Sequence, residues 1–576
     1  MRFQQSSQTR GRQKNSKDSE FWTNPAHAPA ARKGVAEEPA MMSRAHAARL
    51  LGSLTTALVA CAIAACSPAD PAQPVQTADA AMGSDVADVA TSPLDTPDVQ
   101  KIDAAFSEAV VGPAADASVS DADAAGAEVS VPAAISPVVD QGPAYTLTGA
   151  GCAVPAPLVP SAKCASVVCP AGQACMGAGH CLPVAPVLVD ETAVAAIHPS
   201  VATNGEIWGL AYAFGTPEAK SLNIRVRFFS ADNLDLGEVQ TLTNDTVEMH
   251  SNPQLFSLGG DDWLVGWKSE HLLSGYSSLS LRRVTTLGAG GGQTVVFASA
   301  VSQWFSNVIG PKFAHLPGAN AFAVVWGAGA NGEKHAVYAQ PLSRTAEFLG
   351  PAVKLSDSAD WSWSAAVTST STGVFAVWTA WLGAKKSNVV RIKGRRLDAL
   401  GKPDGPEFML PEFGKVYEGQ PSVQSFADGS VVVVRALANI QTKMAPVKYQ
   451  AILLSNPDQT TISAQLPVFG EDTSYLMFNA PIAGHFPGRA VVMWQDYGLY
   501  ESSGSVYLKR YYRNANVFDC AATDLAVPLI PGTQARYHQP SIATFSDGRI
   551  LAAWAATLGS GTPDKLQRIA LRFLAQ

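Results

Sequence analysis

Six cysteines carry the clearest chemistry of this 576-residue chain. Five fall within thirty residues and the sixth lies far downstream, namely Cys152, Cys164, Cys169, Cys175, Cys181 and Cys520. Six cysteines allow three disulfides in fifteen connectivities. Four of them, between Cys164 and Cys181, could form two bonds, which would leave Cys152 and Cys520 as the third pair. Zinc is the alternative, but no C-x-x-C pair with a tetrahedral ligand set is present. We predict a disulfide-rich module over residues 152–182, with no metal site and no cofactor.

A second set of candidate residues stands near the start of a repeated sequence phrase. The set consists of aromatic residues, histidines and one glutamate: His198, His250, Trp361, Trp363, Tyr417, Glu418, Tyr537 and His538. Aromatic rings and histidines on loops that a rigid scaffold holds are suited to sugar stacking, peptide capture or a protein partner. We predict that these residues form one binding surface. For each of them, packing between neighbouring repeats is the alternative.

Catalytic motifs are weak by comparison. The chain contains no H-E-x-x-H, G-x-S-x-G or P-loop sequence. Asp428 and Asp547 each precede a glycine in a turn pair, where Asp is favoured for backbone reasons, so we assign neither a catalytic role. One pair of carboxylates stays open, Glu248 with Glu418. An inverting glycosidase needs two carboxyl groups about 6.5–9.5 Å apart.

The repeated phrase predicts the elements that position these residues. A Pro-led apolar step, a polar turn and an apolar run ending in an aromatic residue occur seven times, at intervals of 53 to 60 residues. The anchors that begin the copies are Pro199, Pro253, Pro311, Ser364, Pro421, Pro481 and Pro540. A second position also recurs, 13 to 15 residues after each anchor, and we call it the aromatic slot. It holds Tyr212, Trp267, Trp326, Trp378, Arg435, Trp494 and Trp554. We interpret the tryptophans of this slot as core residues.

Each copy has the pattern of a small antiparallel sheet. Turn pairs such as Asp428-Gly429 predict a hairpin, and alternating stretches such as residues 388–403 supply a third strand and usually a fourth. Four short strands repeated at this period are typical of a β-propeller blade, although a pair of β-sandwiches has similar turn spacing. We predict an all-β, seven-bladed β-propeller over residues 183–576, with the candidate binding residues around the mouth of its central channel.

The two ends of the repeat region predict how the ring closes. The last copy runs out after residues 566–576, one strand short, whereas residues 186–195 precede the first anchor without a blade of their own. We predict that this N-terminal strand completes blade seven. Closing the ring from both ends of the chain would protect the sheet edges.

The N-terminal region predicts where the protein is held. Residues 42–66 place Arg44 and Arg49 before an uncharged apolar stretch of sixteen residues, which is typical of a secretory signal and too short for a membrane span. The segment resembles a bacterial lipoprotein signal peptide, in which a Leu or Ile stands three residues before the cysteine that is lipidated. The resemblance implies lipidation at Cys66, with Cys61 as the alternative. An ordinary secretion signal stays open.

The segments around this signal have no globular pattern. Residues 1–41 read as a non-native or unstructured extension, because the tandem Met41-Met42 suggests the true start. Residues 67–151 contain thirteen acidic residues, one basic residue and two aromatics, a composition that cannot bury a core. We predict a disordered tether with a reach of about 50 Å. Ser67 stands where the lipoprotein family usually has Asp for inner-membrane retention, so the resemblance implies the outer membrane or cell surface.

Charge and overall organisation narrow the partners. The chain carries a net charge of -7, yet the residues after the tether sum to zero, so we expect no nucleic-acid partner. The arrangement resembles uncharacterised bacterial lipoproteins with a Cys-rich module and a C-terminal β-propeller. That resemblance implies a non-catalytic binding or scaffolding module for a glycan, peptide or protein, with acyl chains in the lipid bilayer. The alternative is a propeller glycosidase or polysaccharide lyase with carboxylates at the channel mouth.

Overall fold

The computed structural model describes most of the chain from residue 145 onward. The described residues are 145–148, 152–155, 162–189, 195–215, 221–233, 235–272, 277–288, 292–301, 310–318, 320–329, 335–356, 361–382, 389–412, 416–439, 448–456, 461–465, 481–484, 488–497, 504–525, 536–558 and 566–575. Residues 1–41, the predicted signal with Cys61 and Cys66, and nearly all of the tether lie outside them. Among the described residues, no helix is long and apolar enough to cross a membrane.

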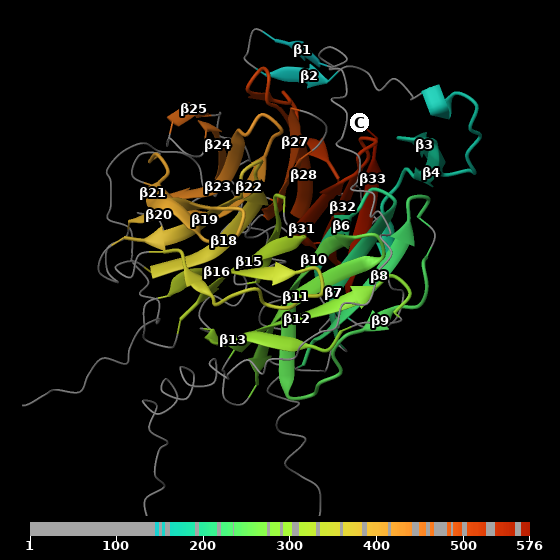
Figure 1. The fold of residues 1–576 in the computed structure, drawn as a ribbon. Helices are drawn as coiled ribbons and strands as arrows, with labels where there is room; N and C mark the ends of the chain where they lie inside the picture. The colour runs from blue at the N-terminus through green and yellow to red at the C-terminus, as the bar shows by residue number, and fades with distance from the viewer. Residues whose placement is uncertain are drawn as a thin grey trace, which may run out of the picture. The chain divides into compact units, whose positions relative to one another are not determined.

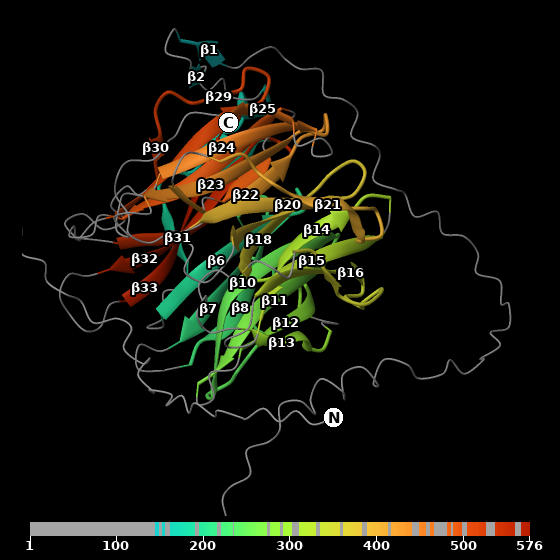
Figure 2. The ribbon, with the colours of Figure 1, turned by 90° about the vertical axis from the view of Figure 1, so that its left-hand side faces the viewer.

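Seven antiparallel sheets form a seven-bladed β-propeller, which confirms the predicted fold (Figures 1 and 2). Blade one contains β6 (Ala195–Thr203), β7 (Ile207–Gly215), β8 (Asn223–Ser230) and β9 (Gln240–Thr241). Blade two contains β10 (Glu248–Gly259), β11 (Asp262–His271), β12 (Ser277–Thr285) and β13 (Val295–Val301). Blade three contains β14 (Lys312–Leu316), β15 (Ala321–Ala328), β16 (Ala336–Ser343) and β17 (Val353–Lys354).

The remaining blades follow the same order. Blade four contains β18 (Trp361–Ser369), β19 (Val374–Trp381), β20 (Val390–Leu397) and β21 (Pro403–Met409). Blade five contains β22 (Val416–Ser425), β23 (Val431–Asn439), β24 (Lys448–Asn456) and β25 (Thr461–Gln465). Blade six contains β26 (Ile482–Gly484), β27 (Arg489–Tyr497), β28 (Gly504–Tyr512) and β29 (Val517–Phe518), and β30 (Thr523–Asp524) also pairs with β28. Blade seven contains β31 (Arg536–Thr544), β32 (Ile550–Leu558), β33 (Leu566–Leu574) and β5 (Val187–Val189).

The ring closes as the sequence predicted. Strand β5 pairs antiparallel with β33, and Leu188 lies opposite Ala570. An N-terminal strand therefore supplies the fourth strand of the last blade. Because both ends of the repeat region share one sheet, opening the ring requires breaking a β-ladder between segments that lie nearly four hundred residues apart.

The predicted aromatic slot is part of the core. Its six aromatic residues lie on the second strands of their blades and are at most 4% exposed. These strands are buried on both faces, as in the "AFAVVWGA" run of β15, because each blade packs between two neighbours. The hydrophobic clusters accordingly contain residues of adjacent blades rather than of single sheets.

A β-bulge recurs at the start of the innermost strands. In five blades, two residues of the innermost strand lie opposite the single slot residue on the second strand. The first of the two has a positive φ of 48° to 56°, namely His198, Asn252, Ser364, Gln420 and Gln539. The second is proline in four of the blades, because proline has no N–H to give to the ladder and is tolerated at a bulge. In blade four Ser364 takes the first position, so the anchor predicted there moves by one residue to Ala365.

The Cys-rich module consists of short elements joined by disulfides. It contains β2 (Ala153–Pro155), the 3-10 turn η1 (Ala162–Cys164), β3 (Gln173–Met176) and β4 (His180–Pro183), and β1 (Tyr145–Leu147) pairs with β2. Disulfides join Cys164 to Cys175 and Cys169 to Cys181. A third disulfide joins Cys152 to Cys520, which directly follows β29 and Asp519 in blade six. This pair is the one that remains, in the sequence-based prediction, after the other four cysteines are paired.

The module packs across the seam where the ring closes. The amide of Ala178, in the β3–β4 turn, donates to Oδ2 of Asp547 in the β31–β32 turn at 3.1 Å. His180 pairs through Nδ1 with Oδ1 of Asp232 in blade one at 2.5 Å. Arg549 links the same two blades, because its Nη1 donates to the carbonyl of Ala231 at 2.6 Å. The module therefore contacts blades seven and one together, and its disulfide reaches blade six.

The long-range disulfide is expected to stabilise the ring more than the short ones. A Cys152→Ser, Cys520→Ser double variant should lower the free energy of unfolding by about 2–4 kcal/mol, because the bond spans 368 residues and restricts the unfolded chain. Denaturant titration followed by tryptophan fluorescence measures the change. The control is Cys164→Ser, Cys175→Ser, whose bond spans 11 residues. Equal losses in the two double variants would contradict the prediction.

Candidate functional site

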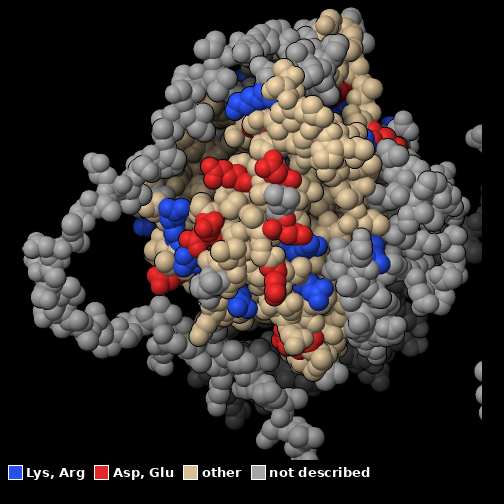
Figure 3. Space-filling view, turned by 90° about the vertical axis from the view of Figure 1, so that its right-hand side faces the viewer, with Lys and Arg blue, Asp and Glu red and all other residues tan. Residues whose placement is uncertain are grey.

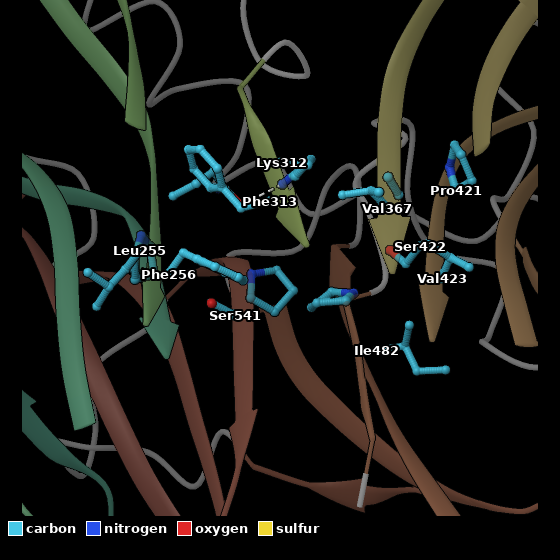
Figure 4. Close-up of a pocket in the computed structure, with 15 residues that line it drawn as sticks. Leu255, Phe256, Lys312, Phe313, Val367, Pro421, Ser422, Val423, Ile482 and Ser541 are labelled. Carbon is cyan, nitrogen blue, oxygen red and sulfur yellow. Dashed lines mark hydrogen bonds between the residues drawn. The ribbon is translucent and has the colours of Figure 1, made fainter. Parts of the chain in front are cut away.

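A cavity of about 230 Å³ lies where the seven innermost strands converge (Figure 4). Every blade contributes to its wall, and the anchors Pro199, Pro421, Pro481 and Pro540 are among the lining residues. In four of the five bulged blades the residue directly after the bulge also lines the cavity, namely Gln254, Ala366, Ser422 and Ser541. The extra residue of a bulge changes which face of the strand the following side chains occupy. The wall is therefore made mainly of proline rings and apolar side chains, with a few polar groups.

Lys312 is the charged group of this wall. Its Nζ donates to Oε1 of Gln254 at 2.7 Å, across the boundary between blades three and two. Burial lowers the pKa of Lys312 to about 8, so the ammonium remains the main form at neutral pH. None of the described residues that line the cavity is acidic. Among the described lining residues the cavity thus presents one charged side chain, that of Lys312, together with the polar groups of Gln254, Ser422 and Ser541.

The structure places the predicted binding residues mostly inside or between blades. His250, Trp363 and Glu418 are at most 5% exposed, and His198, Trp361 and Tyr417 are half-buried. The backbone of Tyr537 and His538 belongs to β31, while their side chains lie outside the described residues. The set therefore does not form an open ring of exposed aromatic residues among its described members.

Packing contacts account for the aromatic members of the set. Trp361 stacks on His335 of blade three, with ring centroids 5.1 Å apart and planes inclined by 27°. Trp363 meets Trp381 of its own blade edge-on at 6.3 Å. Burial raises the pKa of Tyr417 far above its usual range. His198 contributes its bulge amide, which donates to Oε1 of Gln539 in blade seven at 2.9 Å.

Glu418 forms a buried ion pair that explains the one irregular copy of the aromatic slot. Nη1 of Arg435 lies 2.6 Å from Oε2 of Glu418, and both side chains are fully buried. Nη2 of Arg435 also donates to Oε1 of Gln450 at 2.6 Å. In blade five the slot is thus filled by the guanidinium of Arg435. Its charge is neutralised by Glu418, and its N–H groups donate hydrogen bonds to side chains of the neighbouring strands. Glu418 does not present its carboxylate to a ligand.

The carboxylates of the possible glycosidase pair have different partners. Glu418 belongs to blade five and is bonded to Arg435, whereas Glu248 belongs to blade two. Glu248 lies near His250, with 3.9 Å between its Oε2 and Nε2 of the imidazole. Asp245 completes a group whose ligand atoms lie within 4.8 Å of one another, so these three residues could hold a metal ion.

Sequence reasoning missed both Lys312 and Asp245. The signal for Lys312 was present, because it directly follows the anchor Pro311, just as Gln254 follows Pro253. Asp245 stands in the loop before the second copy, outside the repeated phrase, so its proximity to His250 depends on how that loop folds.

Surface charges on one side of the ring are mixed. Figure 3 shows the side where β8 and β9 lie in Figure 1, and acidic side chains gather in the middle of it with basic ones around them. Among the described residues of blades one and two, Arg227 pairs with Asp235 at 2.9 Å and Arg283 with Asp262 at 2.7 Å. Basic groups on this side are therefore interrupted by acidic ones.

Removing one partner of the buried ion pair should be costly. Glu418→Gln leaves the Arg435 guanidinium without its carboxylate, so we expect the free energy of unfolding to fall by about 3–5 kcal/mol. Asp235→Asn is the control, since that exposed carboxylate pairs with the partly exposed Arg227 and the pair should contribute about 0–1 kcal/mol. Chemical denaturation of both variants decides the point. If both variants lost the same free energy of unfolding, the prediction that the buried ion pair stabilises blade five would be contradicted.

Comparisons with known proteins give a weak likeness to solved structures. No protein-family profile matches the chain, and no curated protein matches it. A Dyadobacter fermentans protein of unknown function is 12% identical, with 68% of this chain and 97% of that one covered and a TM-score of 0.41. An α-L-arabinofuranosidase of Fusarium graminearum is 10% identical over 68% and 97%, with a TM-score of 0.39. A Trypanosoma rangeli sialidase is 11% identical over 71% and 58%, with a TM-score of 0.36.

Proposed function

We propose that the propeller is a non-catalytic binding module whose axial cavity receives a carboxylate-bearing end of a glycan or peptide. The observation that carries this proposal is the ammonium of Lys312, which is the one charged group among the described residues that line the cavity. Its hydrogen bond to Gln254 is to a neutral oxygen, so its charge is not neutralised there. A ligand carboxylate would form a charge-assisted hydrogen bond with this partly buried ammonium.

The size of the cavity favours the end of a chain over a whole ligand. Its volume of about 230 Å³ is smaller than the roughly 300–1,000 Å³ of pockets that enclose drug-sized molecules. The anchors Pro421, Pro481 and Pro540 add rigid rings that need no ordering on binding. A terminal sugar acid or the last residue of a peptide suits this space, with the rest of the ligand outside it.

The same wall is poorly suited to the alternative enzymatic functions. Glycoside hydrolysis by the common mechanisms uses two carboxyl groups beside the scissile bond. The described lining of the cavity has no carboxylate, and Glu418 is bonded to Arg435. These contacts support binding as the role of the cavity rather than glycosidase or lyase chemistry.

The N-terminal region supports a membrane-anchored form of this module. Its resemblance to lipoprotein signals points to acylation of Cys66 and to the outer membrane or cell surface, with residues 67–151 as the tether. Two or more acyl chains are enough for stable anchoring, since each buried methylene contributes about 0.8 kcal/mol. The propeller would then bind its partner at the end of a flexible connection.

The anchor can be tested with two matched cysteine variants. In a bacterial host with lipoprotein processing, Cys66→Ser should abolish acylation and move the protein from the membrane fraction to the soluble fraction. Cys61→Ser should leave both unchanged, because that cysteine would be removed with the signal. Intact mass and fractionation are the measurements. Acylation that persists in Cys66→Ser would place the anchor elsewhere.

The cavity can be tested on an array of peptides and oligosaccharides. We expect the full chain to prefer free over amidated peptide C termini, or acidic over neutral sugars. Lys312→Met should weaken that binding by roughly 10- to 150-fold, the equivalent of about 1.5–3 kcal/mol for a hydrogen bond to a charged group. Lys354→Met, which removes an exposed lysine of β17, is the control. Unchanged binding by Lys312→Met would contradict the proposal.

The same binding should depend on pH with a definite sign. Lys312 is protonated below its pKa of about 8 and neutral above it, while ligand carboxylates stay ionised. Affinity should therefore fall between pH 7 and pH 9, and calorimetry can follow it. The Lys312→Met variant should lose this pH dependence.

A further inference from the structure

Three residues at the start of blade two's innermost strand bring together an imidazole and two carboxylates. Asp245 stands in the loop before β10, Glu248 is the first residue of β10, and His250 follows two positions later. One ligand atom from each lies within 4.8 Å of the others. The side chains thus converge from a stretch of six residues.

His250 is the unusual member of this cluster. It is 5% exposed, and its Nδ1 lies 2.8 Å from Oγ of Ser269 on the neighbouring strand β11. Its Nε2 is also buried but has no hydrogen-bond partner among the described residues. That nitrogen lies 3.9 Å from Oε2 of Glu248, which is too long for a hydrogen bond. A buried polar atom left without a partner calls for an explanation, and a bound ion is one.

The two carboxylates are held beside this nitrogen by backbone contacts. Oδ1 of Asp245 accepts the amides of Val247 at 2.8 Å and Glu248 at 3.1 Å. The amide of Asp245 donates to Oδ1 of Asn223 at 2.8 Å, which ties the loop to blade one. Glu248 is 36% exposed, so the cluster remains open to solvent on its side. The carboxylate of Asp245 is thus held in place, and a metal ion can reach the cluster from the solvent on the side of Glu248.

We propose that Asp245, Glu248 and His250 form a binding site for a divalent transition-metal ion of the zinc type. Each carboxylate would supply one oxygen and His250 would supply Nε2. A neutral imidazole favours zinc and its neighbours, whereas calcium and magnesium prefer oxygen ligands throughout. Three protein ligands leave a fourth tetrahedral position for water or for a group of a bound partner.

Hydrogen bonds around the cluster orient its ligands. The tautomer in which Nδ1 donates its proton to Oγ of Ser269 would leave the lone pair of Nε2, 3.9 Å from Oε2 of Glu248, available to a metal ion. A second hydrogen bond of this kind commonly orients a metal-binding histidine.

This site departs from the expectation of no metal and does not depend on the proposed function. The three residues of the cluster precede Gln254 by four to nine positions in the sequence. None of them lines the cavity. A metal at the cluster could therefore be present whether or not the cavity binds a carboxylate.

The test is a calorimetric titration of the full, disulfide-bonded chain with zinc chloride after treatment with EDTA. We expect one zinc site that calcium chloride does not fill. Glu248→Gln and Asp245→Asn should each weaken zinc binding at least about tenfold, the lower end of what second-shell changes cost. Asn at position 245 keeps an oxygen that can accept the two backbone amides. The control is Glu238→Gln, which changes an exposed acidic residue seven positions before Asp245 and should leave zinc binding as in the unchanged protein.

Circular dichroism of each variant separates loss of binding from loss of folding. Ser269→Ala should also weaken zinc binding, by about 10- to 100-fold, through the orientation of His250. The proposal is overturned if the unchanged protein takes up no zinc, or if Glu248→Gln and Asp245→Asn both bind it with undiminished affinity while remaining folded. Equal affinity for calcium and zinc would also overturn it, because the imidazole would then have no role.

Discussion

The pairing of a β-bulge with a large buried side chain is the constraint on which the rest of this propeller depends. In five blades the two bulge residues of the innermost strand lie opposite the slot residue of the second strand, as His198 and Pro199 lie opposite Tyr212. The bulge amides are then free to bond across seams between blades. That of Gln420 donates to Thr379 of blade four at 2.9 Å, and that of Gln539 donates to Gln495 of blade six at 2.8 Å. One local irregularity therefore joins the blades and also turns the following side chains toward the axis.

Blade five shows what the slot requires. Arg435 replaces the aromatic residue and still lies opposite the bulge, where it is fully buried. Its charge is met by Glu418 and its remaining donors by Gln450 and the carbonyl of Pro411. The position opposite the bulge thus requires a large side chain that fills the space and whose polar groups are hydrogen-bonded. An aromatic ring is not required. Because the ion pair occupies this structural position, its carboxylate is unavailable for the channel.

The sequence allowed the fold to be predicted more fully than the site, and the bulge explains the difference. Blade number, the slot and the closing strand follow from patterns that recur along the chain. Side-chain direction does not, because one extra residue in a strand shifts every following side chain to the other face. Counting from the anchors placed Trp363 and His250 at an exposed mouth, whereas the residues after the anchors, such as Lys312 and Ser422, line the cavity. The cluster with Asp245 needed the folded loop, since nothing in the repeat marks that residue.

The described contacts of the Cys-rich module lie at the end of the ring where the innermost strands end. Its β3–β4 turn contacts the β31–β32 turn through Asp547, which is where the innermost strand of blade seven ends. The cluster of Asp245, Glu248 and His250 lies where the innermost strand of blade two begins. The innermost strands run in the same direction in every blade. The Asp547 contact and the cluster therefore lie on opposite faces of the ring. Closing a ring between distant segments is opposed by chain entropy, and β5, the Asp547 contact and the Cys152–Cys520 bond all act near that closure. The N-terminal region thus stabilises the seam at the end of the ring opposite to the one where the cluster lies.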